Sequence, residues 1–319
     1  MRYWRLLRPG RSLIRSGDAA TGCALAAFHF AYLGADTLPV FAAVVLISLG
    51  LHAAGHLWDA AFDPGLRRGL VQRPGEPEVA LANAPVFLGA AALTLAAWLL
   101  AMSQGPRVLY AAFAAGVIHI AHAAVLRRNA LLGPLSAGLA RGAHILTGLA
   151  SFPLLHLAGF RPALAAAPVT LALYFAAADT PRTAPGARAD RFGTWLALAG
   201  ILATGAAVTL QLPTATARFG PWEAWWTWAP GALGTHLALI LAAIACLTVL
   251  FGFLVAAARA DAEGTARLRR AAAAGGVLLE AAVVAGASLD ADWRVRAAFL
   301  VPLGTLYLVA LRRAWRSRL

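Results

Sequence analysis

The chain has 319 residues, of which 61% are hydrophobic and 13% charged, and its formal net charge at pH 7 is +13. Soluble globular domains average about 45–50% apolar and about 25% charged residues, so this composition excludes an ordinary soluble enzyme and an intrinsically disordered chain. The two cysteines, Cys23 and Cys246, both lie in apolar runs, which excludes a disulfide scaffold and a zinc knuckle.

Runs with few or no charged residues follow one another along the whole chain. Their ranges are 19–35, 37–58, 79–102, 108–126, 130–157, 162–178, 192–212, 232–257, 271–289 and 297–311. Most of them reach the length of about 20 residues that a helix needs to cross a membrane, and backbone groups in lipid must be paired within a helix. We therefore expect an all-α integral membrane protein, a single domain over 1–319 with nine or ten transmembrane helices.

The basic residues are all arginines, and their positions predict the orientation in the membrane. If the N-terminus is cytoplasmic and there are ten spans, the cytoplasmic segments carry 21 arginines and the outer loops carry 5. This excess follows the positive-inside rule. The sequence therefore predicts a multi-pass protein of a bacterial-type inner (plasma) membrane with a cytoplasmic N-terminus. The positive net charge is then explained by the arrangement of the chain in membrane lipid, and the sequence predicts no binding of nucleic acid.

The predicted cytoplasmic loop 55–78 begins with a row of polar residues. His52, His56, Asp59 and Asp63 are spaced by four, three and four residues, which places them on one face of a helix that leaves the membrane. Two carboxylates one turn apart are suited to Mg²⁺, which prefers oxygen ligands. A solvated loop, in which such charges pair with each other and with lipid headgroups, is the alternative that the spacing leaves open.

Polar side chains also lie inside predicted spans, where they are costly and usually face a cavity or a partner. Arg141 and His144 lie one turn apart in the fifth run, and with His52 they are candidate cavity residues. For Arg141 a structural pairing with Glu280 or Asp18 is the alternative. A second pair one turn apart, formed by the histidines at 119 and 122, is expected to make structural hydrogen bonds.

The segment 55–63 resembles the first Asp-rich motif of the UbiA superfamily of intramembrane prenyltransferases, N-D-x-x-D-x-x-x-D with an R-P pair downstream. Here it reads Gly55-His56-Leu57-Trp58-Asp59-Ala60-Ala61-Phe62-Asp63, with Arg73-Pro74 following. The segment 4–22 is similar to the family's entry into the first span, and 126–141 is most similar to the EboC-like branch. The resemblance implies a UbiA-like bundle of helices around a cavity that faces the cytoplasm.

The resemblance also implies a function, the transfer of an isoprenyl group from an isoprenyl diphosphate to an unidentified lipophilic or aromatic acceptor. It implies Asp59 and Asp63 as catalytic residues and Mg²⁺ as the cofactor that assists departure of the diphosphate. The residues implied as metal ligands are His56, Asp59, Asp63, Asp179 and Asp190. Those implied to bind the diphosphate are arginines, whose fork suits phosphate oxygens, namely Arg67, Arg68, Arg73, Arg127 and Arg182.

Three positions depart from the family pattern. His56 replaces the first Asp of the motif, Gly55 replaces the preceding Asn, and Ala184 stands where the EboC-like pattern has Glu. Imidazole is a poorer Mg²⁺ ligand than carboxylate. These departures favour the alternative of a degenerate, non-catalytic UbiA-like component of a metabolite-handling or export system, whereas the retained carboxylates favour an enzyme.

Overall fold

The computed structural model describes residues 6–29, 37–71, 82–129, 132–152 and 162–179, together with isolated positions between 276 and 309. All regular structure in these residues is helical. The helices are α1 (Pro9–Arg15), α2 (Gly17–His29), α3 (Thr37–Phe62), α4 (Pro64–Val71), α5 (Asn83–Ser103), α6 (Pro106–Ala124), the short 3₁₀ helix η2 (Leu126–Arg128), α7 (Leu132–Ala150) and α8 (Pro162–Asp179). The predicted all-α class is confirmed for this part of the chain.

Six of the ten apolar runs coincide with described helices, from the run 19–35 in α2 to the run 162–178 in α8. Among the described helices, α3, α5 and α6 are long and apolar enough to cross a membrane. The runs 192–212 and 232–257 lie outside the described residues, and only isolated positions of the last two runs are described. The count of nine or ten spans and the cytoplasm-facing cavity therefore stay predictions.

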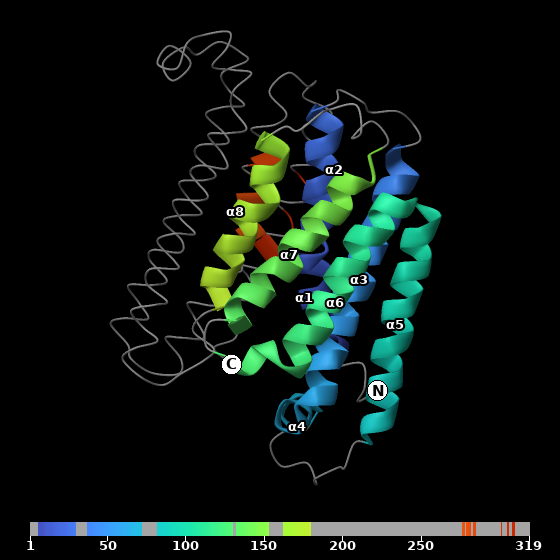
Figure 1. Ribbon diagram of the computed structural model, residues 1–319, viewed down its shortest axis with the longest axis vertical. Coiled ribbons are helices and arrows are strands. Elements are labelled where there is room, and N and C mark those ends of the chain that lie inside the picture. Colours follow the sequence, from blue (N-terminus) through green and yellow to red (C-terminus); the bar gives the residue numbers. More distant parts are fainter. Residues whose placement is uncertain are drawn as a thin grey trace, which may run out of the picture.

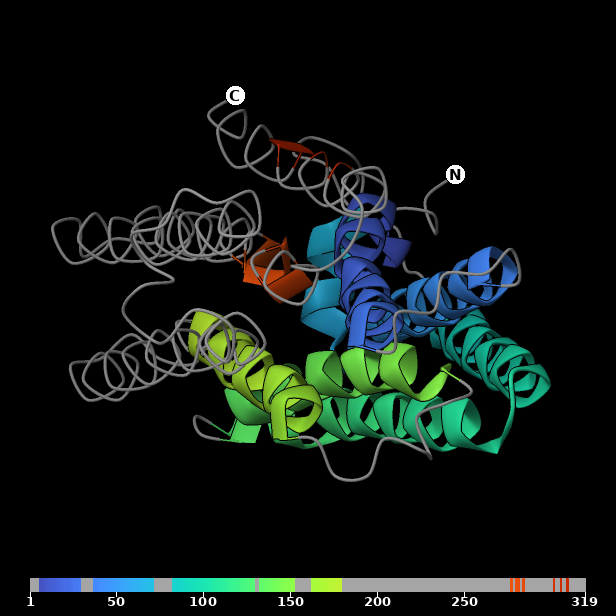
Figure 2. The same ribbon diagram turned by 90° about the horizontal axis from the view of Figure 1, so that it is seen from above.

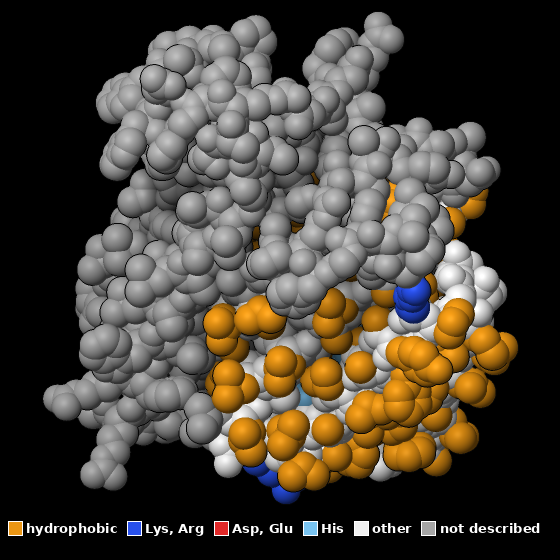
Figure 3. All heavy atoms as spheres, turned by 45° about the horizontal axis from the view of Figure 1, so that its top comes forward, with side chains coloured by type: hydrophobic (Ala, Val, Ile, Leu, Met, Phe, Trp, Pro, Cys, Tyr) orange, Lys and Arg blue, Asp and Glu red, His pale blue; other side chains and the backbone are white. Residues whose placement is uncertain are grey.

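The outward faces of α5 and α6 are apolar. Large hydrophobic side chains that are exposed on these two helices include Phe87, Leu88, Leu95, Leu99, Met102, Tyr110, Phe113 and Val117. Figure 3 shows hydrophobic side chains over much of the visible described surface. Water-soluble monomers rarely expose continuous apolar patches of this kind, so the surface fits the hydrocarbon interior of a membrane.

Helix α7 is central in the described bundle. It contacts α2, α6 and α8, while α3 contacts both α5 and α6. The long helices run side by side in Figure 1, and in the view from above α2, α6 and α8 surround α7 (Figure 2). Polar residues of α7 can therefore meet those of several helices in the interior of the bundle.

Glycines on α7 allow its neighbours to approach at backbone distance. A Cβ atom on Gly148 would lie 2.1 Å from the carbonyl oxygen of Ala19 in α2. One on Gly138 would lie 2.2 Å from the carbonyl oxygen of Ala172 in α8. No side chain fits such a gap, so glycine is required here, as in other small-residue helix contacts within membranes. This close packing carries α2 and α8 against the polar side chains of α7.

Candidate functional site

The carboxyl end of α3 carries the acidic residues that the sequence singled out. His52 and His56 are buried, whereas the side chain of Asp59 is 19% exposed and that of Asp63 is 42% exposed. The face that they share thus passes from the interior of the bundle to its surface. A polar ligand can reach the carboxylates at the exposed end of this face.

Arg127 faces both of these carboxylates. Its Nη1 lies 3.7 Å from Oδ1 of Asp59 and 3.4 Å from Oδ2 of Asp63. It belongs to η2, which follows α6 and precedes α7, so helices far apart in the sequence bring the three groups together. Partly exposed ion pairs of this kind are worth only about 0–1 kcal/mol. An anionic ligand can therefore displace the carboxylates from Arg127 at little cost.

Asp63 has a second role that the sequence analysis missed. Its Oδ1 accepts a hydrogen bond of 2.9 Å from the backbone N–H of Leu66. Asp63 directly precedes Pro64, the first residue of α4, so its carboxylate caps the amino end of that helix. The Asp-Pro pair is the sequence signal that indicates such a cap. Only Oδ2 of Asp63 faces Arg127.

The remaining predicted site residues divide into described and undescribed positions. Arg67 and Arg68 lie on α4, just after the acidic end of α3. Nη1 of Arg67 donates a hydrogen bond to Oδ1 of Asn83 at the start of α5, and Arg68 is exposed. Asp179 is the last residue of α8, and its side chain is not described. The candidates that lie outside the described residues are Arg73, Arg182 and Asp190.

Two buried polar atoms close to this end of α3 have no hydrogen-bond partner among the described residues. They are Nε2 of His56 and Oδ1 of Asp59. A buried polar group without a partner is unfavourable, which favours a ligand at this place. A buried carboxylate oxygen that accepts no hydrogen bond, with a second carboxylate one turn away, suits a hard cation. The residues present therefore fit Mg²⁺, for which Asp59 and Asp63 would be the ligands.

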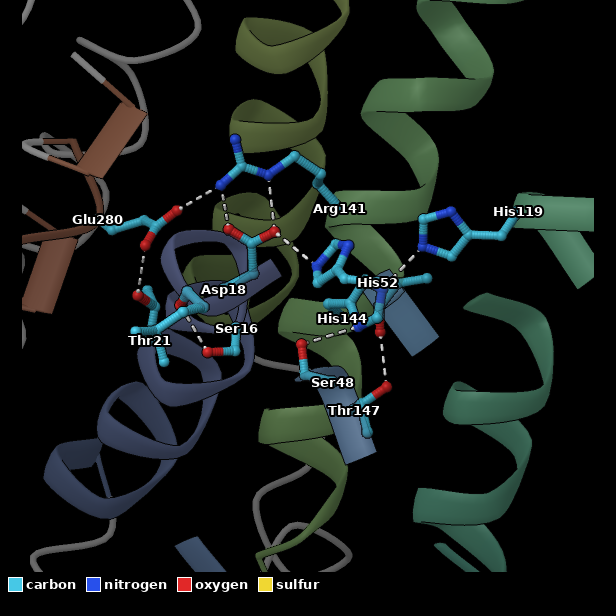
Figure 4. A network of polar contacts seen from close by, with 12 residues as sticks. Ser16, Asp18, Thr21, Ser48, His52, His119, Arg141, His144, Thr147 and Glu280 are labelled. Carbon is cyan, nitrogen blue, oxygen red and sulfur yellow. Dashed lines mark hydrogen bonds and ion pairs between the residues drawn. The ribbon is translucent and has the colours of Figure 1, made fainter. Parts of the chain in front are cut away.

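A second polar cluster lies inside the bundle, around Arg141 (Figure 4). Its Nε donates a hydrogen bond of 2.7 Å to Oδ2 of Asp18, and its Nη2 donates to Oδ1 of Asp18 and, at 3.1 Å, to Oε1 of Glu280. The hydroxyl of Thr21 donates to the other oxygen of Glu280 at 3.4 Å. The guanidinium carbon also lies 3.1 Å from the ring centre of Phe175. This is the structural pairing that the sequence leaves as the alternative to a cavity role for Arg141, and it involves both carboxylates.

The other two candidate cavity residues belong to the same interior region. The rings of His52 and His144 are stacked with their centres 3.8 Å apart, and Oγ of Ser48 lies 3.0 Å from Nδ1 of His144. Nε2 of His52 lies 3.7 Å from Oδ2 of Asp18. All of these side chains are buried. These contacts do not test whether His52 and His144 line a cavity, so that role stays a prediction.

The expected structural hydrogen bonding of the second histidine pair is observed for His122. Its Nδ1 lies 2.8 Å from the hydroxyl oxygen of Ser136 in α7. Such hydrogen bonding is also observed for His119, one turn earlier on α6, whose Nε2 shares a hydrogen bond of 3.1 Å with Nε2 of His144. The two histidines of α6 therefore belong to different clusters.

Comparison with known proteins identifies a solved structure with a similar fold. The chain is similar in structure to a solved digeranylgeranylglyceryl phosphate synthase, described in work on that enzyme in membranes. The TM-score is 0.60 at 15% sequence identity, and the match covers 90% of this chain and 98% of the other. No protein-family profile and no curated protein sequence matches the chain. At this identity the likeness shows a shared fold.

Proposed function

We propose that the protein is a member of the UbiA superfamily that transfers an isoprenyl group from an isoprenyl diphosphate to a lipophilic or aromatic acceptor. The observation that carries the proposal is the meeting of Asp59, Asp63 and Arg127 at the surface end of α3. Support comes from the fold, which is that of a solved digeranylgeranylglyceryl phosphate synthase over 90% of the chain. Together they combine the carboxylates, the arginine and the scaffold that such a reaction needs.

The residues of this end of α3 have distinct roles in the proposed reaction. Asp59 and Asp63 would hold Mg²⁺, which when bound neutralises negative charge on the diphosphate. Arg127, together with Arg67 and Arg68 on α4, donates hydrogen bonds to the diphosphate oxygens. As the bond between the allylic carbon and the diphosphate oxygen breaks, negative charge develops on the leaving group, and these preoriented donors stabilise it.

The apolar interior has a role in the proposed reaction as well. The allylic carbon becomes electron-poor as the diphosphate leaves, and water would capture it. Apolar helix walls exclude water and accommodate the isoprenyl chain. The acceptor then supplies the electron pair for the new bond and gives up a proton.

A non-catalytic member of the same fold is the competing function. The observation that favours it is the place of His56, which is 4% exposed and therefore buried where the family motif has an acidic ligand. In such a protein the pairing of Arg127 with Asp59 and Asp63 would be purely structural. The two functions differ in whether the protein binds an isoprenyl diphosphate.

Transfer of radiolabel tests the proposal directly. Purified protein in detergent is incubated with radiolabelled isoprenyl diphosphates and a lipid extract, with Mg²⁺ or with a chelator. We expect label in a new lipid product with Mg²⁺ only, and none with Asp63→Asn, which removes the charge but keeps an oxygen to cap α4. Failure of the wild-type protein to bind an isoprenyl diphosphate analogue in isothermal titration would refute the proposal.

Arg127 and its neighbour Arg128 provide a matched pair for the same assay. Arg127→Gln removes the cation that faces the carboxylates, and a lost charge-assisted hydrogen bond should weaken donor binding by about 1.5–3 kcal/mol. Arg128→Gln removes the same charge from the same short helix without touching those contacts. Equal effects of the two substitutions would show that the donor is bound through general surface charge. They would contradict a specific contact of Arg127 with the donor.

A further inference from the structure

Three imidazole rings from three different helices meet inside the bundle. They belong to His52 of α3, His119 of α6 and His144 of α7, and one ring nitrogen from each lies within 4.8 Å of the others. Figure 4 shows the three side chains close together beside Asp18. The proposed prenyl transfer uses none of their ring nitrogens.

The hydrogen bonding of His52 is incomplete. This side chain is buried, yet neither of its ring nitrogens has a hydrogen-bond partner among the described residues. The carboxylate of Asp18, at 3.7 Å from Nε2, is beyond hydrogen-bond distance. Because buried imidazole nitrogens are normally satisfied, the ring has room for a ligand that the described residues do not supply.

The spacing of the other two rings suits a metal ion. Nε2 of His119 and Nε2 of His144 are 3.1 Å apart. Two nitrogens bound to one tetrahedral Zn²⁺ at about 2.0–2.1 Å lie about 3.3–3.4 Å from each other. The observed contact is a hydrogen bond, so one of the two Nε2 atoms carries a hydrogen. Coordination of one ion by both rings requires that this hydrogen move to Nδ1 of its ring and that the two nitrogens separate by a few tenths of an ångström.

Neighbouring groups orient the rings in the way that metal-binding histidines require. Oγ of Ser48 lies 3.0 Å from Nδ1 of His144, which leaves Nε2 of that ring directed at the cluster. Histidine ligands of metals characteristically use their second nitrogen for such a contact. The lack of a side chain at Gly55 makes room for His119, since a Cβ there would lie 2.7 Å from Nδ1 of that ring.

A carboxylate lies beside the cluster. Oδ2 of Asp18 is 3.7 Å from Nε2 of His52, and the same carboxylate pairs with the guanidinium of Arg141. In a medium of low dielectric constant, a buried carboxylate favours a cation placed nearby.

We propose that His52, His119 and His144 form a buried site for a divalent transition-metal ion of the Zn²⁺ type. Three neutral imidazoles are a donor set that suits Zn²⁺ and that Mg²⁺ avoids. The site is separate from the acidic end of α3, and it stands whether or not the protein transfers prenyl groups. With three protein ligands, a tetrahedral ion keeps one position for water or another small ligand.

Metal analysis of the full-length protein in detergent tests the site. After incubation with Zn²⁺ and removal of free metal, we expect about one Zn²⁺ per chain. Loading with Co²⁺ in place of Zn²⁺ should give the visible absorption bands of a tetrahedral nitrogen site, and this measurement needs no variant. Folded wild-type protein that retains neither metal would overturn the proposal.

Variants then assign the ligands. His119→Gln should lose the ion, while His122→Gln, one turn further on the same helix and bonded to Ser136, should keep it. Ser48→Ala leaves all three ligands in place and should weaken Zn²⁺ binding by about 10- to 100-fold, because it removes the group that orients His144. Unchanged Zn²⁺ content in both His119→Gln and Ser48→Ala would place the metal elsewhere and refute the assignment.

Discussion

At the scale of single residues, Asp63 combines a structural and a chemical role. One carboxylate oxygen caps α4 through the N–H of Leu66, and the other faces Arg127. The sequence motif predicts only the chemical role, that of a metal ligand, and neither of these two contacts. A simple alanine substitution therefore removes two interactions at once, and an effect on activity would mix loss of chemistry with loss of local structure.

Substitutions of Asp63 can separate the two roles. Asp63→Ala should lower the free energy of unfolding by about 0.5–2 kcal/mol, because the cap of α4 is lost. Asp63→Asn keeps an oxygen acceptor at the cap and should remain near the wild type in thermal unfolding. Equal melting temperatures for Asp63→Ala and the wild type would show that the cap contributes nothing measurable.

The pair of Arg141 and Asp18 gives a second prediction at this scale. Removing one partner of a buried ion pair leaves the other charge uncompensated, which is destabilising by about 3–5 kcal/mol. Arg141→Gln should therefore reduce stability strongly, because both Asp18 and Glu280 lose their cation. Unfolding in mixed detergent micelles measures the effect.

A double substitution serves as the control for that prediction. Asp18→Asn combined with Arg141→Gln removes one carboxylate charge together with the cation. Part of the lost stability should return, because fewer unpaired charges remain in the interior. If the double variant is as unstable as the sum of the two single variants, the two side chains do not interact energetically.

At the scale of the helices, the packing of α7 depends on glycine. Gly148 contacts the backbone of α2, and Gly138 contacts the backbone of α8. These two contacts hold Asp18 of α2 and Phe175 of α8 against Arg141 of α7. The interior polar cluster therefore depends on small residues that have no chemistry of their own.

Substitution of Gly148 tests this dependence. Gly148→Ala would place a Cβ 2.1 Å from the carbonyl oxygen of Ala19, so α2 and α7 must move apart. We expect a lower melting temperature and a lower yield of folded protein. Gly89→Ala on α5 is the control, since its Cβ would meet Leu57 at an ordinary 3.5 Å. Similar losses for both variants would show that any alanine in a span is harmful.

At the scale of the whole molecule, the arginines and the helix directions predict the orientation. Arg67 on α4 bonds to Asn83 at the start of α5, so the end of α3 and the start of α5 lie at the same end of the bundle. Arg127 and Arg128 lie there too, because Arg127 faces Asp59 and Asp63. The positive-inside rule predicts that this end lies in the cytoplasm.

Labelling of single cysteines in whole cells tests the orientation, in a background with Cys23 and Cys246 replaced. Ser103→Cys lies at the far end of α5 and is exposed, so a membrane-impermeant reagent should label it from outside. Ala184→Cys, in a segment outside the described residues that the sequence predicts to be cytoplasmic, should react only after the cells are opened. The reverse pattern would mean that the acidic end of α3 faces outward.

The features of the fold and of the candidate site that could be predicted from the sequence are those that depend on residues close together along the chain. Hydrophobic runs predicted six of the described helices, because the membrane requires a local property, about 20 apolar residues in a row. The helical spacing from His52 to Asp63 likewise predicted a shared face. The cap at Asp63 is also local and could have been found from the Asp-Pro pair.

The sequence by itself determined the membrane class, the helices and the chemistry available at the end of α3, since each follows from neighbours along the chain. Only the tertiary structure decided which distant groups meet. Arg127 joins Asp59 and Asp63, and Arg141 has both Asp18 and Glu280 as partners. His119 meets His52 and His144 rather than His122. The physical reason is that helix packing determines which helix faces oppose each other. Here the packing depends on glycines that let the backbones of neighbouring helices touch.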